Sequence, residues 1–482
     1  MSKDTGLVRG IGLPGAISLN MINMIGVGPF VTLPLIVLAM HGPQAILGWI
    51  LGALLAACDG LVWAELGAAM PQAGGSYEYL RTIYGPKRAG RYLSFLYIWQ
   101  LSFSAPLSVA SGCVGLAQYA GFLWPGLRKV YFSYQLPIPV PFVHTLPLTI
   151  LLGPATLVAM LCCMIAAALL YRNIRAVTRF SGLLWLGVMG TMMTVIVTGL
   201  LHFHPRLAFG FPAGAFHMST EFFTGLGAAL LIATYDYWGA YNICFLGAEV
   251  RNPGRTIPLA IVWSVGLVAA LYLLMNTGVL GSMPWQELIG AAGTNARLSV
   301  AAVVVQRAYG AIAGRVVALL VVWTAFASVY ALLLGYSRVP YAAAMDNNYF
   351  RIFARVHPRH RIPNVSLLML AGVAMLFCVL QLADLVAALV VIRILLQFLL
   401  QQVGVMVLRH TQPAMNRPFR IWLYPLPPLL AIAGFLYILF SRPHFAREIF
   451  FAMFVVFTGS VTYLLRALKR QEWPFGRQPR SA

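Results

Sequence analysis

Two segments of this sequence combine exposed backbone polar groups with residues that can bind a charged solute. Residues 24–30 read MIGVGPF, where two glycines lower helix propensity and a proline removes one backbone donor. Residues 235–239 read YDYWG and carry a carboxylate. Backbone N–H and C=O groups freed from a helix can bind an ion or a charged solute. We therefore expect a solute site built from these two segments.

Asp236 is the strongest single candidate for chemistry. An ionisable residue in the middle of an apolar run is costly, so it is a functional hypothesis by default. Its carboxylate could pair with a solute amine, or it could take up and release a proton. The structural alternative is that it accepts hydrogen bonds from unwound backbone N–H groups around it.

The composition places both segments inside a membrane. Of the 482 residues, 60% are hydrophobic and 9% are charged, and the mean hydropathy is +0.81. In a soluble protein about a quarter of all residues are charged, because charged side chains are needed to cover its surface. Unwound backbone at membrane depth survives only where it is buried in protein or lines a polar cavity. The sequence therefore predicts an all-α membrane protein.

About twelve apolar runs follow one another along the chain, most of them close to the roughly 20 residues that a spanning helix needs. They occupy residues 11–40, 43–69, 89–122, 148–171, 180–202, 222–248, 256–280, 313–345, 364–383, 385–408, 422–441 and 446–467. We therefore expect residues 1–482 to form a single polytopic transporter domain. The two irregular segments lie in its first and sixth runs.

The basic residues lie in short gaps between these runs rather than on one face or in a tail. The formal net charge of +21 therefore does not indicate nucleic-acid binding. With the N-terminus in the cytoplasm, roughly three times as many Lys and Arg residues fall on the cytoplasmic side as on the other. We expect a multi-pass protein of the cell (plasma or inner) membrane with both termini cytoplasmic.

Enzyme chemistry has no visible basis in the sequence. It contains no GKS/T phosphate loop, no HExxH and no GxSxG motif. The six cysteines fall inside predicted helices without metal-site spacing, and we expect them to be small buried residues. We therefore expect no enzymatic activity, no catalytic residues, no cofactor and no bound metal.

The two interrupted helices each open a set of five helices. This arrangement suggests an inverted repeat with the solute bound at the midplane between the two breaks. Residues 11–202 would form the first repeat and residues 222–408 the second, and residues 422–467 would add two further helices.

Four motifs in this order resemble those of the amino acid–polyamine–organocation (APC) permeases. Residues 26–30 look like that family's GSGIF break, and residues 63–77 are similar to its AELG-x-x-x-P-x-x-GG-x-Y signature. Residues 249–258 resemble its E-V-x-N-P-x-R-x-I-P loop, and residues 337–358 resemble the stretch that ends its eighth helix. The resemblance covers nearly the whole chain. It implies a LeuT-like 5+5 inverted repeat with broken helices 1 and 6, followed by two C-terminal helices.

The resemblance also implies substrate-binding roles at the first break. The backbone of Gly26, Val27 and Gly28 would bind the substrate carboxylate, as an exposed half-helix N-terminus can. Asn23, one turn earlier, would line the same cavity.

At the second break, the resemblance implies binding of the substrate amine. The carbonyl groups around Ile232, Ala233 and Tyr235 would accept it, and Tyr235 stands where the family places an aromatic lid. Asp236 beside them would add a carboxylate.

Two positions depart from the family pattern. Val27 replaces a serine, which removes one hydroxyl from the carboxylate side of the site. Several proton-coupled members carry a lysine in helix five, where this chain has Val188 and no lysine. The usual coupling group is therefore missing or displaced, and both a proton and a sodium ion stay open as the coupling ion.

Three other charged residues have predicted roles. Glu65 and Glu249, near the cytoplasmic ends of the second and sixth helices, are candidates with Asp236 for gating or proton coupling. Their structural alternative is helix capping and salt bridges to loop arginines. Arg393 lies inside the tenth run, and we expect it to snorkel outward with Asp384 as its partner.

The favoured function is secondary active transport of an amino acid or related small amine across the lipid bilayer by alternating access. The alternative is a polyamine or organic cation transporter of the same fold, because Asp236 and Val27 shift the site toward cations. A transporter-like amino acid receptor is a third reading. It would need a cytosolic signalling domain, and the segment after Arg466 is too short for one.

Overall fold

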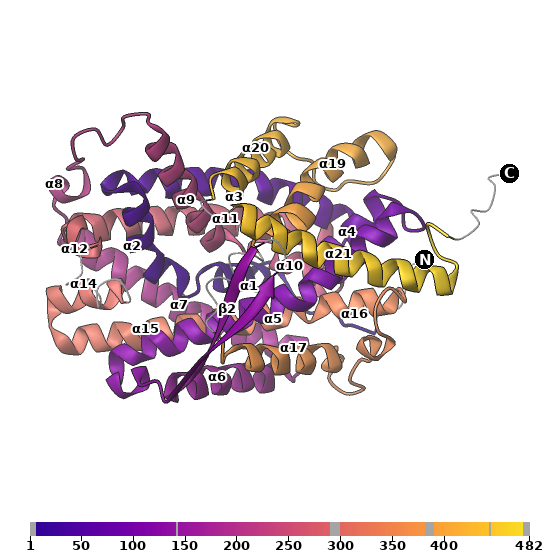
Figure 1. Cartoon of the computed structure of the whole chain (residues 1–482), viewed down its shortest axis with the longest axis horizontal. Coiled ribbons are helices and arrows are strands. Elements are labelled where there is room, and N and C mark those ends of the chain that lie inside the picture. The colour runs from indigo at the N-terminus through magenta and orange to yellow at the C-terminus, as the bar shows by residue number, and fades with distance from the viewer. Residues whose placement is uncertain (1–5, 141–142, 290–298, 381–389, 443–444, 476–482) are drawn as a thin grey trace.

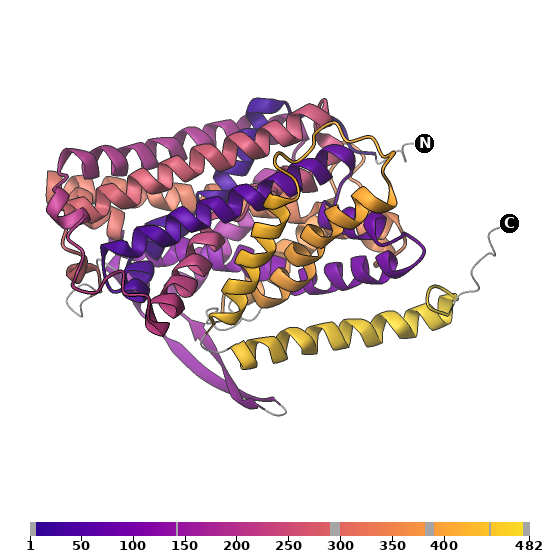
Figure 2. The same ribbon diagram turned by 90° about the horizontal axis from the view of Figure 1, so that it is seen from above.

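The chain folds into a bundle of helices that lie side by side along the long dimension of the molecule (Figures 1 and 2). The computed structural model describes residues 6–140, 143–289, 299–380, 390–442 and 445–475. Within these residues, seven helices are long and apolar enough to cross a membrane, and one bent helix pair makes up to eight candidate spans. The chain is therefore an integral membrane protein of the helical type.

The candidate spans include most of the long helices. In chain order they are η1 with α3 (Pro43–Ala45 and Ile46–Ala69), α5 (Ala89–Leu123), α7 (Ile174–Leu201), α11 (Pro253–Ser282), α15 with α16 (Ala311–Tyr336 and Arg338–Met345), Val390–Thr411, and α21 (Phe445–Arg470). Val390–Thr411 contains the π-helical turn η6 (Ile394–Leu399) and α19 (Leu400–Thr411).

Shorter helices connect and cover these spans. They are α4 (Ser76–Ile83), η2 (Pro125–Arg128), α6 (Pro154–Leu170), α8 (Pro205–Ala208), α9 (Thr220–Tyr237), α10 (Asn242–Phe245), η3 (Gly247–Glu249), α12 (Trp285–Ile289), α14 (Val300–Tyr309), η5 (Arg351–Ala354), α17 (Asn364–Phe377) and α20 (Leu426–Phe440).

The break predicted in the first run is confirmed. Helices α1 (Leu13–Met24) and α2 (Gly28–Met40) are bent by 44° across residues 25–27. Pro29 stands in the first turn of α2, where its fixed φ favours a helix start and its missing N–H costs nothing. The glycines before it lower the propensity to continue α1. Local sequence therefore both ends one helix and begins the next.

The irregular centre predicted in the sixth run is confirmed as well. Helix α9 ends at Tyr237 and α10 begins at Asn242, so residues 238–241 separate them. Gly239 has a φ of +124°, which a residue with a side chain rarely adopts. Asp236 thus lies in the last turn of α9, directly before the break.

Each of the twelve predicted runs contains at least one helix. Eight of them hold the long helices or the bent pair α1–α2, while α6, α9 with α10, α17 and α20 occupy runs whose helices are shorter or less apolar. Length and hydropathy therefore support up to eight spans, and twelve spans stay a prediction.

A β-hairpin corrects the expectation of an all-α chain. Strands β1 (Phe132–Val140) and β2 (Val143–Leu152) pair antiparallel, with Phe132 opposite Leu152, and project from the bundle (Figure 2). Residues 148–152 were expected to be helical as the start of the fourth run. Gly153 and Pro154 instead delay the helix, because proline favours the first turn of a helix and disfavours the α conformation in the residue before it.

Different segments of the chain lie at the two ends of the bundle. At one end the N–H groups of Gly10 and Ile11 donate to the Glu249 carbonyl, at 2.8 and 3.0 Å. The last turn of α21 lies at this same end, which we call the N-terminal end (Figure 1). The far end holds α8, α12 and α14 (Figure 1).

Candidate functional site

A cavity of ≈720 Å³ lies between the two helix breaks. Most of the predicted substrate-binding residues line it: Asn23, Gly26, Val27, Gly28, Tyr235 and Asp236. Trp238, Gly239 and Tyr241 of the second break line it too. Ile232 and Ala233 lie further back in α9, outside the cavity wall, and Ala233 is fully buried. The structure therefore brings both breaks to one cavity.

Tyr272 of α11 ties the two breaks together. Its hydroxyl lies 2.9 Å from the carbonyl of Met24, the last residue of α1, and 3.3 Å from the carbonyl of Asp236. Asn23 adds a second tie, because its side-chain amide donates to the Gly239 carbonyl at 3.4 Å. The ends of α1 and α9 are therefore held against each other by one side chain from α11 and one from α1 itself.

Further amide and hydroxyl groups satisfy the backbone near the breaks. The N–H of Ile243 in α10 donates to the side-chain oxygen of Asn20 at 3.0 Å. The Asn242 side chain donates to the Ala331 carbonyl in α15 at 3.2 Å, and Ser328 donates to the Asn23 carbonyl at 3.4 Å. Buried backbone groups need such partners, so this network stabilises the unwound segments.

Asp236 places its carboxylate against the start of α2. The side chain is 3% exposed, and Oδ2 accepts a hydrogen bond from the Thr32 hydroxyl at 2.6 Å. A Cβ at Gly28 would lie 2.1 Å from Oδ1, so a side chain at position 28 would displace the carboxylate. A helix N-terminus stabilises a negative charge beside it. Asp236 therefore has structural partners and also lines the cavity.

Arg393 corrects the expectation that it snorkels outward. Its side chain is 4% exposed and lines the cavity. Nη2 donates to the Tyr336 hydroxyl at 2.7 Å, and the guanidinium carbon lies 5.3 Å from the centroid of the same ring. Asp384, the expected partner, lies outside the described residues. The neighbouring helices bury Arg393, and their positions cannot be read from the run that contains it.

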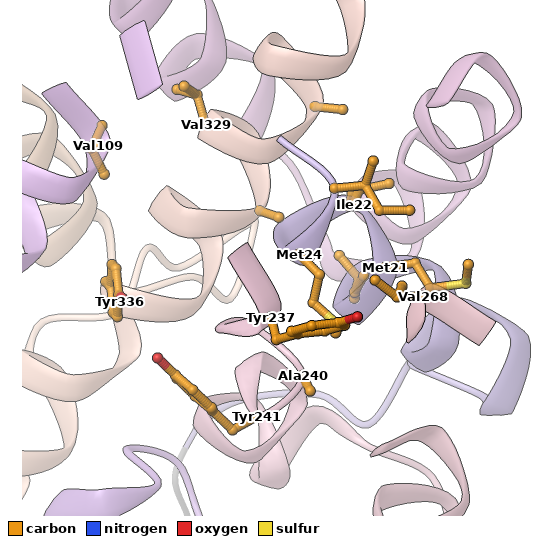
Figure 3. Close-up of a cluster of buried hydrophobic side chains, with 14 of the residues drawn as sticks. Met21, Ile22, Met24, Val109, Tyr237, Ala240, Tyr241, Val268, Val329 and Tyr336 are labelled. Carbon is orange, nitrogen blue, oxygen red and sulfur yellow. The ribbon is translucent and has the colours of Figure 1, made fainter. Parts of the chain in front are cut away.

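Aromatic side chains form another part of the cavity wall. In Figure 3 the hydroxyl of Tyr241 points toward Tyr336 of α15, and both residues line the cavity. Trp238 stacks on Phe398 of the π-helical turn η6, with ring centroids 4.7 Å apart. Neither Tyr336 nor Phe398 was predicted from the sequence to belong to the site. No sequence signal distinguishes Tyr336 from Tyr330 and Tyr341 in the same run.

The cavity extends toward the C-terminal end of α5. Its lining continues along this helix from Ser108 and Ser111 to the exposed Gln118, and then to Lys129 beyond η2. The base of β2 also contributes, and the N–H of Leu151 donates to the Val379 carbonyl at 2.7 Å. The cavity thus extends away from the N-terminal end.

Buried ion pairs occupy the N-terminal end. Glu249 is 0% exposed, and its two carboxylate oxygens accept hydrogen bonds from Nε and Nη2 of Arg338, at 2.9 and 3.1 Å. Glu65 accepts from Nε of Arg409 at 3.0 Å and from the N–H of Ile421 at 2.8 Å. Neither glutamate lines the cavity. The structure therefore shows both glutamates in salt bridges to arginines, as expected if their role is structural.

Other residues considered for coupling or metal binding are buried. Val188, at the position of the missing lysine, is 0% exposed. All six cysteines are free and buried, and Cys378 lines the cavity. The described residues contain no cluster of three or more His, Cys, Asp or Glu side chains that could hold a metal ion.

Known proteins are similar to this chain over the region that contains both breaks and the cavity-lining residues. A family model described as amino acid permease matches residues 11–465. The serine/threonine exchanger SteT of Bacillus subtilis is 26% identical over 451 residues, which are 91% of this chain and 92% of that protein. The human Asc-type amino acid transporter 1 is 27% identical over 434 residues, 87% of this chain and 75% of that protein. A methylthioribose transporter of Bacillus subtilis is 24% identical over 486 residues, 97% and 95% of the two chains.

Proposed function

Because the chain belongs to the amino acid permease family, we propose that it is a secondary active transporter of amino acids or related small amines. It works by alternating access, with the solute bound in the cavity between the two breaks. The observation that carries this proposal is the joint lining of one ≈720 Å³ cavity by both breaks, including Asp236. A cavity at such a junction of broken helices can hold a small zwitterion whose amine faces a carboxylate.

The proposed membrane arrangement has twelve spans in a 5+5 inverted repeat with two further helices. Residues 11–202 form the first repeat, residues 222–408 the second, and α20 and α21 follow. Both ends of the chain lie in the cytoplasm, in line with the bias of Lys and Arg. In this arrangement the cavity extends toward the outside, and the buried ion pairs lie on the cytoplasmic side.

Glu65 and Glu249 then belong to the cytoplasmic gate. Their pairs with Arg409 and Arg338 hold together segments that lie far apart in the sequence. For the solute to leave on the cytoplasmic side, these segments must separate. Breaking a buried ion pair is costly, so the pairs favour the state in which this side is closed.

Asp236 is the proposed contact for the solute amine, and it is also the candidate proton site. The helix-five position that holds a lysine in some relatives is Val188 here. Coupling to a proton therefore rests on Asp236, while coupling to sodium would rest on carbonyl groups at the breaks. A pH gradient and a sodium gradient applied separately distinguish the two.

The proposal is tested with the purified protein in lipid vesicles. Uptake of a panel of radiolabelled amino acids, competed by polyamines and by methylthioribose, identifies the solute class. We expect saturable uptake of at least one amino acid and no competition by spermidine. Uptake of spermidine without uptake of any amino acid would support the polyamine alternative instead.

A further inference from the structure

Arg393 is a buried cation without an anionic partner among the described residues. Its Nη2 bonds to the neutral Tyr336 hydroxyl, and its buried Nε has no hydrogen-bond partner. Within the described residues no carboxylate lies close enough to form an ion pair with it, whereas Arg338, Arg409 and Arg417 all have one. A buried charge normally requires a paired opposite charge. Among the described parts of the chain, the cavity that Arg393 lines is where a solute could supply such a charge.

The backbone around Arg393 is also irregular. The π-helical turn η6 begins at the next residue, and such turns occur frequently at functional sites. Phe398 in this turn stacks on Trp238 of the second break. The segment that presents Arg393 is therefore packed directly on an element of the proposed solute site.

The position of Asp236 disfavours a solute carboxylate at the first break. Its Oδ1 already lies beside Gly28, where the family resemblance would place the substrate carboxylate. Two negative charges in contact inside a low-dielectric cavity repel each other. A positively charged guanidinium on another wall offers a bidentate alternative, which is the geometry that arginine provides for carboxylates.

We propose that Arg393 binds a carboxylate of the solute while the solute amine faces Asp236. This inference rests on the proposed transport function and makes its site more specific. The carboxylate can be the α-carboxylate of any amino acid or the side-chain carboxylate of an acidic one. In both cases a solute that lacks a carboxylate gains nothing from Arg393.

The test compares wild type, Arg393→Gln and Arg393→Lys by ligand binding to the purified full-length chain. Serine and ethanolamine differ by the α-carboxylate, and glutamate adds a side-chain carboxylate. If Arg393 binds the α-carboxylate, Arg393→Gln weakens serine binding by about tenfold to a hundredfold and leaves ethanolamine unchanged. If it binds the side-chain carboxylate, only glutamate binding weakens by this factor. Arg393→Lys keeps the charge, so it retains part of the affinity.

Thermal unfolding separates binding from a structural role. Because Arg393 has no anionic partner among the described residues, Arg393→Gln is expected to leave the unfolding temperature unchanged or to raise it. The matched control is Arg315→Gln, which changes an exposed arginine in α15. Unchanged affinity for serine and glutamate in Arg393→Gln would overturn the inference, as would an equal loss of ethanolamine. Absence of any amino acid binding or uptake by wild type would instead contradict the proposed function.

Discussion

At the scale of single residues, Asp236 and Arg393 give the cavity one buried charge of each sign. Asp236 could be identified from the sequence because it interrupts an apolar run three residues before Gly239. Arg393 interrupts an apolar run in the same way, yet its direction was predicted wrongly. Snorkelling or burial depends on which helices surround the residue, and that is a property of the packed bundle.

Asp236→Asn is expected to weaken binding of a transported amino acid by about tenfold to a hundredfold. Charge-assisted hydrogen bonds contribute about 1.5–3 kcal/mol, and the amide cannot replace the charge facing the amine. Equilibrium binding and pH-driven uptake are measured together. The matched control is Glu221→Gln, an exposed carboxylate in the first turn of the same helix. Normal binding with loss of pH-driven accumulation would make Asp236 a proton site, and no change in either would make it structural.

Glu249→Gln is expected to destabilise the protein by about 3–5 kcal/mol, because it leaves the guanidinium of Arg338, 1% exposed, without its charge partner. Replacing both residues by apolar ones should restore much of this loss. The unfolding temperature in detergent reports the change. Glu287→Gln, which breaks an exposed pair with Arg307, serves as the control and should cost less than about 1 kcal/mol. Equal effects of the two single substitutions would contradict the burial argument.

At the scale of elements, the two broken helices were predictable and the hairpin and the π-helical turn were not. Glycine and proline at 26–29 act on the backbone locally, so their effect can be read from the sequence. The strands β1 and β2 follow from pairing with each other, and η6 has no distinct residue pattern. Tyr272 joins both breaks from α11, and such a contact appears only once the helices are packed.

Gly28→Leu is expected to abolish transport while the protein still folds. Any Cβ at this position would contact the Asp236 carboxylate, and a larger side chain would fill the cavity at the start of α2. Gly28→Ala tests the same contact with the smallest side chain and should already reduce uptake. Gly190→Ala in α7, where a Cβ would meet no atom within 4 Å, is the control. Normal uptake by Gly28→Leu would mean that the first break is a simple kink.

At the scale of the whole molecule, composition predicted the membrane environment and the motifs predicted the family. The number of spans stays a prediction. Helices such as α17 and α20 lie in predicted spans but are short for crossing a membrane. The cavity belongs to this scale too, since its wall combines residues from positions 23 to 393. The individual runs gave no information on which of their faces would meet.

The proposed topology places residues 349–362 in the cytoplasm. Arg359 is exposed in this segment, so Arg359→Cys should react with a membrane-impermeant thiol reagent only after cells are opened. Lys129→Cys, exposed beyond η2 in a segment that the proposed topology places outside, should react in intact cells and serves as the opposite control. The reverse pattern would contradict the orientation with both termini inside.

The most direct test of the central claim is solute protection of a cysteine placed in the cavity. Ser111 and Gln118 both line the cavity from α5, and Gln118, two turns further along the same helix, is exposed. Ser111→Cys and Gln118→Cys are prepared without the native cysteines, and both are labelled in vesicles with and without the transported amino acid. The amino acid is expected to slow labelling of Ser111→Cys, with a concentration dependence that matches transport. Labelling of Ser111→Cys at an unchanged rate, in a variant that still transports the amino acid, would contradict it.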